Sequence, residues 1–211
     1  MTDPLLQLRS ATRRAKSDVA NKIVSMFLHE LSRDLSKSWP VRLESNTYIE
    51  NVRATFGYEC PYCNRDLRET AAVVEHLDGM NRYRVGLHVA GNVLVACRSC
   101  NNEKRRDDSA KVLTLADTGW ESFLSHNGSC QSSCRTCHYW AAHWAEPGER
   151  IKNLSLNKSR LQTFRAGYPE FSKMRSGVAR DLSALVGALY GDCQKFAEDE
   201  INSLLKRYST L

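Results

Sequence analysis

Two pairs of cysteines restrict what this chain can fold into more than any other feature of its sequence. Cys60-Pro-Tyr-Cys63 and Cys97-Arg-Ser-Cys100 each place two thiols on one tight turn. Two thiolates on such a turn chelate one ion, and a second pair completes the tetrahedral set of sulfur ligands that zinc prefers. A redox function would be expected near a βαβ pattern, which the sequence lacks. We therefore predict a structural zinc site with these four cysteines as ligands.

The composition agrees with a globular protein in a reducing compartment. Hydrophobic residues make up 42% and charged residues 26% of the 211 residues, so a buried core is feasible and global disorder is unexpected. No apolar run approaches the roughly 20 residues that span a bilayer, and the first residues do not resemble a signal peptide. We expect a cytoplasmic protein, in which eight cysteines favour metal binding over disulfides. The net charge of +6 is compatible with a polyanionic partner.

The apolar periodicity predicts helices on both sides of the cysteine pairs. Residues 1–55 read as a helical region, with a long helix from about Asp3 to Ser38 and a shorter one from Asn46 to Phe56, closed by Gly57. The long helix carries a repeat of apolar residues every four positions, preceded by basic ones: Ile23, Phe27, Leu31 and Leu35, after Arg9, Arg13, Arg14 and Lys16. We expect this region to contact DNA or to dimerise.

Residues 113–211 form the third predicted region, a Cys- and Trp-rich stretch followed by a helical tail. The turn at Glu146-Pro147-Gly148-Glu149 separates the two parts, and we expect Gly191-Asp192 to break the tail into two helices. The tryptophans of the first part, Trp120, Trp140 and Trp144, favour core packing over stacking on bases.

The middle region, residues 56–112, combines the cysteine pairs with a group of polar residues. Val73-Val74-Glu75-His76-Leu77-Asp78-Gly79 and Gly91-Asn92-Val93-Leu94-Val95-Ala96-Cys97 contain two short β-branched runs around a glycine-containing loop. Asn101-Asn102-Glu103-Lys104-Arg105 then follows the second pair. Strand, loop, strand and helix is the simplest assignment.

The order of these motifs resembles the HNH nuclease family, whose fold is called ββα-metal. CxxC, an acid followed by His, Gly-Asn with an apolar run, and CxxC-Asn-x-x-Lys occur in that order over roughly residues 56–108. The stretch from Trp120 to His126 and the later cysteines are also similar to extensions of some bacterial HNH proteins. The resemblance implies an α+β fold: a mostly helical chain around a central zinc-stabilised ββα-metal hairpin and helix.

The family resemblance also implies a role for each polar residue. His76 would be the general base that deprotonates the attacking water. Glu75 and Asn101 would bind one catalytic divalent ion, Mg²⁺ with Mn²⁺ as a substitute. Asn92 would pin the loop and set the angle of the catalytic His76 ring. Lys104, together with Arg105 in the basic cluster that follows, would contact DNA phosphates.

The sequence leaves alternatives open at three of these positions. Family members often carry Asp in place of Glu75, and Asp78 is an additional or alternative ligand. His88, in the same loop, is a rival candidate for the general base. Asn102 competes with Asn101, although adjacency to Cys100 favours Asn101.

A second zinc site is possible in the C-terminal region. Cys130, Cys134 and Cys137 form a CxxxCxxC motif, and we take His138 as the fourth ligand. His126, His143 and Cys193 stay open as alternatives, and buried structural thiols are the competing interpretation.

The leading functional hypothesis is an endonuclease that hydrolyses phosphodiester bonds in double-stranded DNA. The size and the flanking helices favour a restriction-type enzyme that works as a homodimer, an expectation by analogy. A zinc-ribbon protein that binds DNA without catalysis is the alternative from another class. A toxin-like nuclease that acts on RNA or without sequence preference is the third hypothesis.

Overall fold

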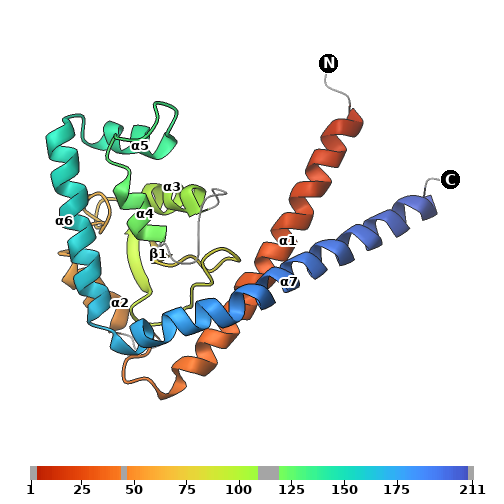
Figure 1. Ribbon diagram of the computed structural model, residues 1–211, viewed down its shortest axis with the longest axis horizontal. Helices are drawn as coiled ribbons and strands as arrows, with labels where there is room; N and C mark the ends of the chain where they lie inside the picture. The colour runs from red at the N-terminus through yellow and green to blue at the C-terminus, as the bar shows by residue number, and fades with distance from the viewer. Residues whose placement is uncertain (1–3, 44–46, 109–118, 209–211) are drawn as a thin grey trace.

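Helices make up most of the chain in the computed structural model, which describes residues 4–43, 47–108 and 119–208 (Figure 1). The side chains of residues 4–16, 204, 205 and 208 lie outside the description, as does the predicted boundary at residues 112–113. The basic residues from Arg9 to Lys16 are therefore among the side chains not described.

The elements are α1 (Pro4–Leu35), the 3₁₀ helix η1 (Ser36–Ser38), α2 (Tyr48–Thr55), β1 (Ala72–His76), β2 (Val93–Cys97), α3 (Arg98–Asp108), α4 (Gly119–Ser125), α5 (Arg135–His143), α6 (Pro147–Ala166) and α7 (Pro169–Tyr208). The prediction of a mostly helical α+β chain is confirmed.

The predicted closure of α2 by Gly57 is right, the predicted start at Asn46 lies outside the described residues, and the predicted break within α7 is wrong. Gly57 follows α2 with a φ of 63°, and the N–H of Tyr58 donates to the carbonyl of Arg53 at 2.8 Å, which closes the helix. The expected break at Gly191-Asp192 does not occur, because α7 continues to Tyr208. A glycine costs a helix only about 1 kcal/mol, and the buried side chains of Val186 and Tyr190 hold this part of α7 in place.

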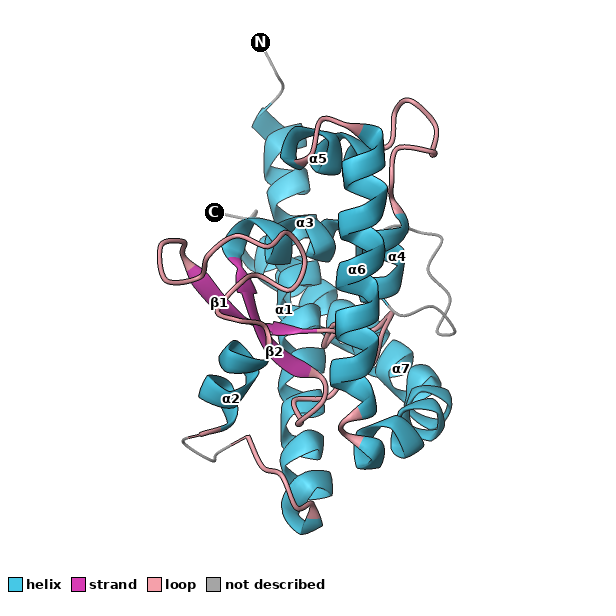
Figure 2. Ribbon diagram, turned by 90° about the vertical axis from the view of Figure 1, so that its left-hand side faces the viewer, coloured by secondary structure: helices cyan, strands magenta, loops and turns pink. Residues whose placement is uncertain are grey.

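The two strands form a small antiparallel sheet that is followed directly by α3. Glu75 pairs with Leu94 and His76 with Val93, so the hairpin opens into its long loop at the end of β1. Because Cys97 ends β2 and Arg98 begins α3, the chain passes from strand to helix without a connecting residue. Figure 2 shows the sheet surrounded by helices, with α2 and α6 on different sides of it.

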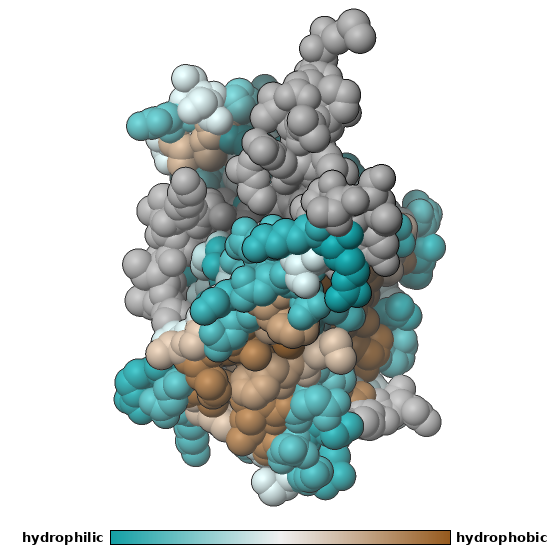
Figure 3. All heavy atoms as spheres, turned by 90° about the vertical axis from the view of Figure 1, so that its right-hand side faces the viewer, coloured by the Kyte–Doolittle hydropathy of each residue, from teal (hydrophilic) through white to brown (hydrophobic). Residues whose placement is uncertain are grey.

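Two hydrophobic clusters hold the molecule together. The first joins α2, the first cysteine turn, β2 and helices α4 to α6, with Trp120 and Trp140 at most 1% exposed, so the prediction of tryptophan core packing is confirmed for these two. The second joins α1 to α7, which cross in Figure 1 and diverge towards the two chain ends. Figure 3 shows hydrophobic side chains gathered on the face where these two helices pack.

The loop 77–92 between the strands belongs to both clusters. Leu77 and Ala90 are buried in the first, whereas Val85, Leu87 and Val89 are buried in the second. Within this loop a Cβ on Gly86 would lie 1.8 Å from the carbonyl oxygen of Asp78, so only glycine fits there. The loop is therefore packed on both sides.

Among the described helices, we find none with a stretch long and apolar enough to cross a membrane.

Candidate active site

The four cysteines of the two CxxC pairs converge on one buried point. Cys60 and Cys63 lie on a turn ahead of β1, Cys97 ends β2, and Cys100 lies in the first turn of α3. Their sulfur atoms lie within 4.8 Å of one another, and all four side chains are buried. Residues far apart in the sequence thus form one compact cluster of thiols.

The spacing of these sulfur atoms suits a structural zinc ion. A Zn–S distance of about 2.3 Å predicts tetrahedral sulfur–sulfur distances of about 3.8 Å, and the sulfur atoms of Cys63 and Cys97 are 3.7 Å apart. The backbone N–H groups of Cys97 and Cys100 donate to the sulfur atoms of Cys60 and Cys97, each at 3.4 Å. Hydrogen bonds from Cys100, Cys60 and Cys63 lower the pKa of Cys97, whereas burial raises the pKa of Cys100. Because thiolate is the form that binds metal, zinc binding at this cluster would release protons.

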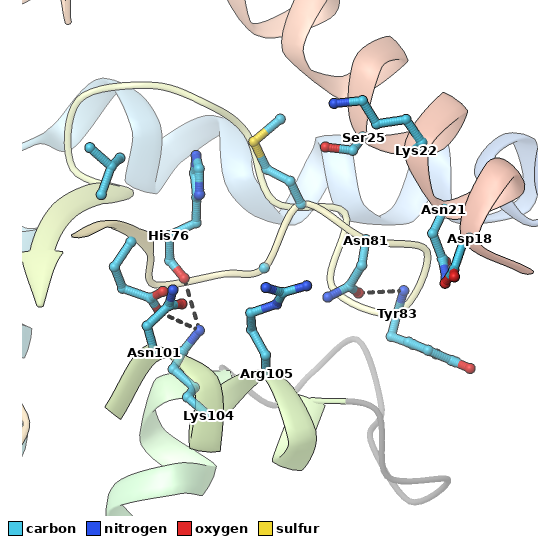
Figure 4. Close-up of a pocket in the computed structure, with 14 residues that line it drawn as sticks. Asp18, Asn21, Lys22, Ser25, His76, Asn81, Tyr83, Asn101, Lys104 and Arg105 are labelled. Atoms are coloured by element: carbon cyan, nitrogen blue, oxygen red, sulfur yellow. Dashed lines mark hydrogen bonds and ion pairs between the residues drawn. The ribbon is translucent and has the colours of Figure 1, made fainter. Parts of the chain in front are cut away.

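A cavity of about 590 Å³ lies between the end of β1, α3 and α1. Glu75 and His76 of β1 and Asn101 and Arg105 of α3 line one side of it. Helix α1 forms the opposite wall, as Figure 4 shows. Three of the residues predicted to do chemistry, Glu75, His76 and Asn101, therefore border one space.

Glu75 is held inside this wall by an ion pair. Its side chain is 4% exposed, and the Nζ of Lys104, itself 1% exposed, lies 2.8 Å from Glu75 Oε1. The hydroxyl of Tyr62 donates to the same oxygen at 3.2 Å. The Nζ of Lys104 also donates to the carbonyl of His76 at 2.8 Å. Lys104 thus fixes both the carboxylate and the end of β1, and its predicted phosphate contact stays a prediction.

The imidazole of His76 projects to the other side of β1. The dashed lines of Figure 4 join Lys104 to its backbone carbonyl, while its ring points away from Lys104 and Asn101. Adjacent strand residues face opposite sides of a sheet, so this separation from Glu75 is expected. Burial, then the ring of His88 and the charge of Lys104, lower the pKa of His76 to about 3, so the ring is neutral near pH 7.

Asn101 and Arg105 of α3 line the cavity, whereas Asn102 does not. Residues 101 and 105 are one helical turn apart and face the same way, while Asn102 is exposed on the outer face of α3. Arg105 is exposed at the rim. The geometry therefore favours Asn101 over Asn102, as adjacency to Cys100 suggested.

Asn92 is buried completely and uses its side-chain amide to pin the loop. Its Nδ2 donates to the carbonyls of Asp78 at 3.0 Å and Leu87 at 2.7 Å. Its Oδ1 accepts from the backbone N–H of Asp78 at 2.8 Å and from Arg165 at 3.0 Å. These bonds use the whole amide. We therefore assign Asn92 a role in holding the loop and do not place it at the reacting atoms.

Asp78 is engaged in a buried ion-pair cluster away from the metal ligands suggested by the sequence. Arg165 Nη1 lies 2.8 Å and Arg175 Nε 2.7 Å from its Oδ2. Burial alone would raise the pKa of Asp78, but these two guanidinium groups outweigh it and keep the pKa below its usual value. Asp78 is also not among the residues that line the cavity. The structure therefore gives Asp78 the task of joining the loop to α6 and α7, in place of the alternative metal ligand.

The second cysteine cluster forms with a different histidine from the one we predicted. His126, Cys130, Cys134 and Cys137 bring their ligand atoms within 4.8 Å of one another. The Nδ1 of His126 lies 3.2 Å from the sulfur of Cys134. His138 turns away, because its Nε2 is 2.7 Å from the carbonyl oxygen of Ser132. His138 is therefore corrected to His126 as the fourth member, and this set also suits structural zinc.

Sequence reasoning missed the wall that α1 adds to the cavity. Asp18, Asn21, Lys22 and Ser25 line it from α1. Their spacing of three and four residues places them on one helix face, next to the face of the buried Ala20, Val24 and Leu28. That polar spacing was visible in the sequence, but a solvated helix face has the same pattern.

We found no match for this chain among protein-family models, curated proteins or solved structures.

Proposed function

We propose that this chain is a metal-dependent endonuclease of the HNH type that hydrolyses phosphodiester bonds in double-stranded DNA in the cytoplasm. The observation that carries the proposal is the meeting of Glu75, His76 and Asn101 at one cavity. Glu75 and His76 stand on β1, and Asn101 stands on α3 directly after Cys100 of the clustered thiols. The motif order that resembles the HNH family supplies the chemical interpretation.

The zinc ion of this proposal would be held by Cys60, Cys63, Cys97 and Cys100. Four sulfur ligands leave no open coordination position, so the ion would be structural. It would tie the turn ahead of β1 to the junction of β2 and α3. The positions of Glu75 and Asn101 relative to each other would then depend on it, because one lies on β1 and the other on α3.

The catalytic ion would be held by oxygen atoms of Glu75 and Asn101. A carboxylate and an amide oxygen beside a cavity of about 590 Å³ fit Mg²⁺, which keeps several of its waters and binds few protein ligands. When bound, the ion would supply positive charge against the phosphate and the departing oxygen. Lys104, with its Nζ 2.8 Å from Glu75 Oε1, holds the carboxylate in place.

His76 would act as the general base. The lowered pKa keeps its ring neutral, the form that a general base requires, and makes it a weaker base than free imidazole. Its ring points away from Asn101 (Figure 4). A phosphate bound in the cavity would share that space with His76, Glu75 and Asn101. Asn92 would serve this step indirectly by holding the loop that follows His76.

The DNA strand would meet basic residues on both walls of the cavity. Lys22 of α1 and Arg105 of α3 face the space from opposite sides (Figure 4). Two cations across a groove attract a backbone phosphate without reading the base sequence. The net charge of +6 supports the same partner.

We further propose that the restriction-type reaction uses a homodimer. Val19, Ile23 and Met26 are 37–57% exposed and lie on one face of α1, and the partner helix α7 also exposes Leu185 and Phe196. A second copy placed on this surface would cover it and supply the second active site that a double-strand cut requires. Light scattering of the purified chain tests it: a mass near twice 23.9 kDa supports the dimer, and 23.9 kDa contradicts it.

Nicking of supercoiled plasmid with Mg²⁺ or Mn²⁺ tests the activity. Wild-type protein should convert the plasmid to nicked and linear forms, and His76→Ala should lower the rate by about 100-fold or more while DNA binding persists. His138→Ala, which changes an exposed histidine, is the matched control and should cleave at the wild-type rate. Cleavage by His76→Ala at the wild-type rate would contradict the proposed base.

The same purified protein distinguishes the two alternative functions. A zinc-ribbon protein that binds DNA without catalysis would retain zinc and bind tightly but leave every plasmid intact under either metal. A toxin-like nuclease would degrade RNA or cut DNA without sequence preference. Sequencing the ends of digested genomic DNA separates specific from unspecific cleavage.

A further inference from the structure

His76 does not stand alone at the end of β1, because the ring of His88 lies directly against it. The Nε2 of His76 and the Nδ1 of His88 are 2.9 Å apart, the distance of a hydrogen bond. The two ring centroids are 5.1 Å apart. His88 is not one of the residues that line the cavity, whereas His76 is. The pair therefore has one member at the cavity and one behind it.

Helix α1 and the second hydrophobic cluster fix the position of His88. The buried hydroxyl of Ser32 accepts the backbone N–H of His88 at 2.7 Å. The ring of His29 stacks on the ring of His88 with centroids 4.6 Å apart and planes 22° apart. Leu87 and Val89, on either side of His88, are each 1% exposed. Backbone and ring of His88 are thus both held by contacts outside the active cavity.

A hydrogen bond between two neutral imidazoles requires one ring nitrogen to donate and the other to accept. If His88 donated to Nε2 of His76, the proton of His76 would sit on Nδ1 and both of its nitrogens would be occupied. If His76 donates from Nε2, its Nδ1 keeps a lone pair outside the pair of rings. Only the second arrangement leaves His76 able to accept a proton from water.

We propose that His88 is a positioning residue that accepts a hydrogen bond from the Nε2–H of His76, fixes the orientation of that ring and leaves Nδ1 as the basic nitrogen. This inference rests on the proposed function, since it names the partner of the same general base. It also replaces the reading of His88 as a rival base. Through Ser32 and His29, it makes α1 part of the support of the active site.

Histidine ¹⁵N NMR of the zinc-loaded protein tests the arrangement without any cleavage. The chain has six histidines, and His76→Asn identifies the signals of His76 by their loss. We expect His76 in the wild type to carry its proton on Nε2. His88→Ala should shift His76 towards a mixture of tautomers, and His88→Asn should preserve the wild-type signal, because an amide oxygen near the former Nδ1 can accept the same bond. A proton on Nδ1 in the wild type, or no change in His88→Ala, would overturn the proposal.

Single-turnover cleavage provides the second measurement. His88→Ala should lower the cleavage rate by about 10- to 100-fold, the usual effect of losing an orienting partner, with the Kd for uncleaved DNA unchanged. His88→Asn should recover most of the rate, and the control His138→Ala should keep it. If His88→Asn is folded but as inactive as His88→Ala, His88 itself takes the proton and the positioning role is wrong. If the NMR result holds and the wild type cuts no DNA, the proposed function fails while the orientation of His76 by His88 stands.

Discussion

The two cysteine clusters use similar ligands in very different surroundings. Cys60, Cys97 and Cys100 of the first cluster are fully buried, and Cys63 is 6% exposed. In the second cluster Cys130 is exposed, and His126 and Cys134 are only partly buried. The first lies inside the larger hydrophobic cluster, whereas the second lies at the start of the short helix α5.

The difference teaches that the same ligand chemistry supports two structural tasks. The first cluster joins the turn ahead of β1 to the β2–α3 junction, so the walls of the cavity depend on it. The second gathers the segment from His126 to Cys137, which has no strand and one short helix. Loss of the first cluster should therefore destabilise the whole molecule, and loss of the second should destabilise mainly its own segment.

The two clusters are also in physical contact through α5. Tyr139 of α5 has its hydroxyl 3.1 Å from the sulfur of Cys100. Burial and the neighbouring Cys100 raise the pKa of Tyr139, so the hydroxyl keeps its proton and can donate it to the sulfur. Arg135, also in α5, pairs with Glu103 of α3 at 2.8 Å. A change in the folding of the second segment can therefore alter the stability of the first cluster through these two contacts of α5.

The largest effect is expected from removing a ligand of the buried cluster. Cys97→Ser should abolish zinc binding there and, with it, the cooperative unfolding transition, because structural zinc contributes on the order of 10 kcal/mol to folding. Zinc analysis and thermal unfolding followed by circular dichroism measure both. Cys193→Ser, outside both clusters, is the control and should keep the metal content. A folded Cys97→Ser protein with full zinc would break the comparison.

A smaller effect is expected from the equivalent change in the exposed cluster. Cys134→Ser should lower the zinc content by one equivalent and leave a cooperative transition. Its thermal midpoint should fall by about 5 °C, the shift that roughly 2 kcal/mol produces in a chain of this size. The same melting and metal measurements apply. Complete unfolding of this variant would show that both clusters are equally central.

The choice between two histidines sharpens the composition of the exposed cluster. His126→Ala should weaken zinc binding there by about 100-fold or more, because removing a direct ligand exceeds the roughly 10- to 100-fold loss caused by removing an outer-shell partner. His138→Ala should leave the affinity unchanged, since its ring faces the carbonyl of Ser132. Competition with a colorimetric chelator gives both affinities. The reverse order of effects would restore His138 as the ligand.

The smallest effect is expected at the contact between the clusters. Tyr139→Phe keeps the ring and removes the hydroxyl that lies against Cys100, so it should cost about 1 kcal/mol. It should also speed the release of zinc from the buried cluster to a chelator, with Cys134→Ser present to silence the other site. An unchanged unfolding midpoint and an unchanged release rate would mean that the two clusters are independent.

The sequence was informative wherever the residues of a predicted site lie only a few positions apart. The CxxC pairs, the Glu75-His76 neighbours and Asn101 after Cys100 could be read directly, because two to four residues on one turn or helix leave few geometries. His138 was chosen wrongly for a related reason. Nearness in sequence to Cys137 favoured His138 over His126. The direction of a helical side chain depends on its position around the helix, and the ring of His138 points to the carbonyl of Ser132.

What the amino-acid sequence determined by itself is therefore local: a mostly helical α+β chain, paired thiols suited to zinc, and a polar group between them. Tertiary structure decided the rest. It placed α1 across the cavity, took Asp78 into a pair with Arg165 and Arg175, and set His88 behind His76. The contacts of Asp78 and the support of His88 by Ser32 join residues 56 to 97 positions apart in the sequence. Burial of the loop 77–92 between two hydrophobic clusters fixes them, and no single stretch of sequence encodes that packing.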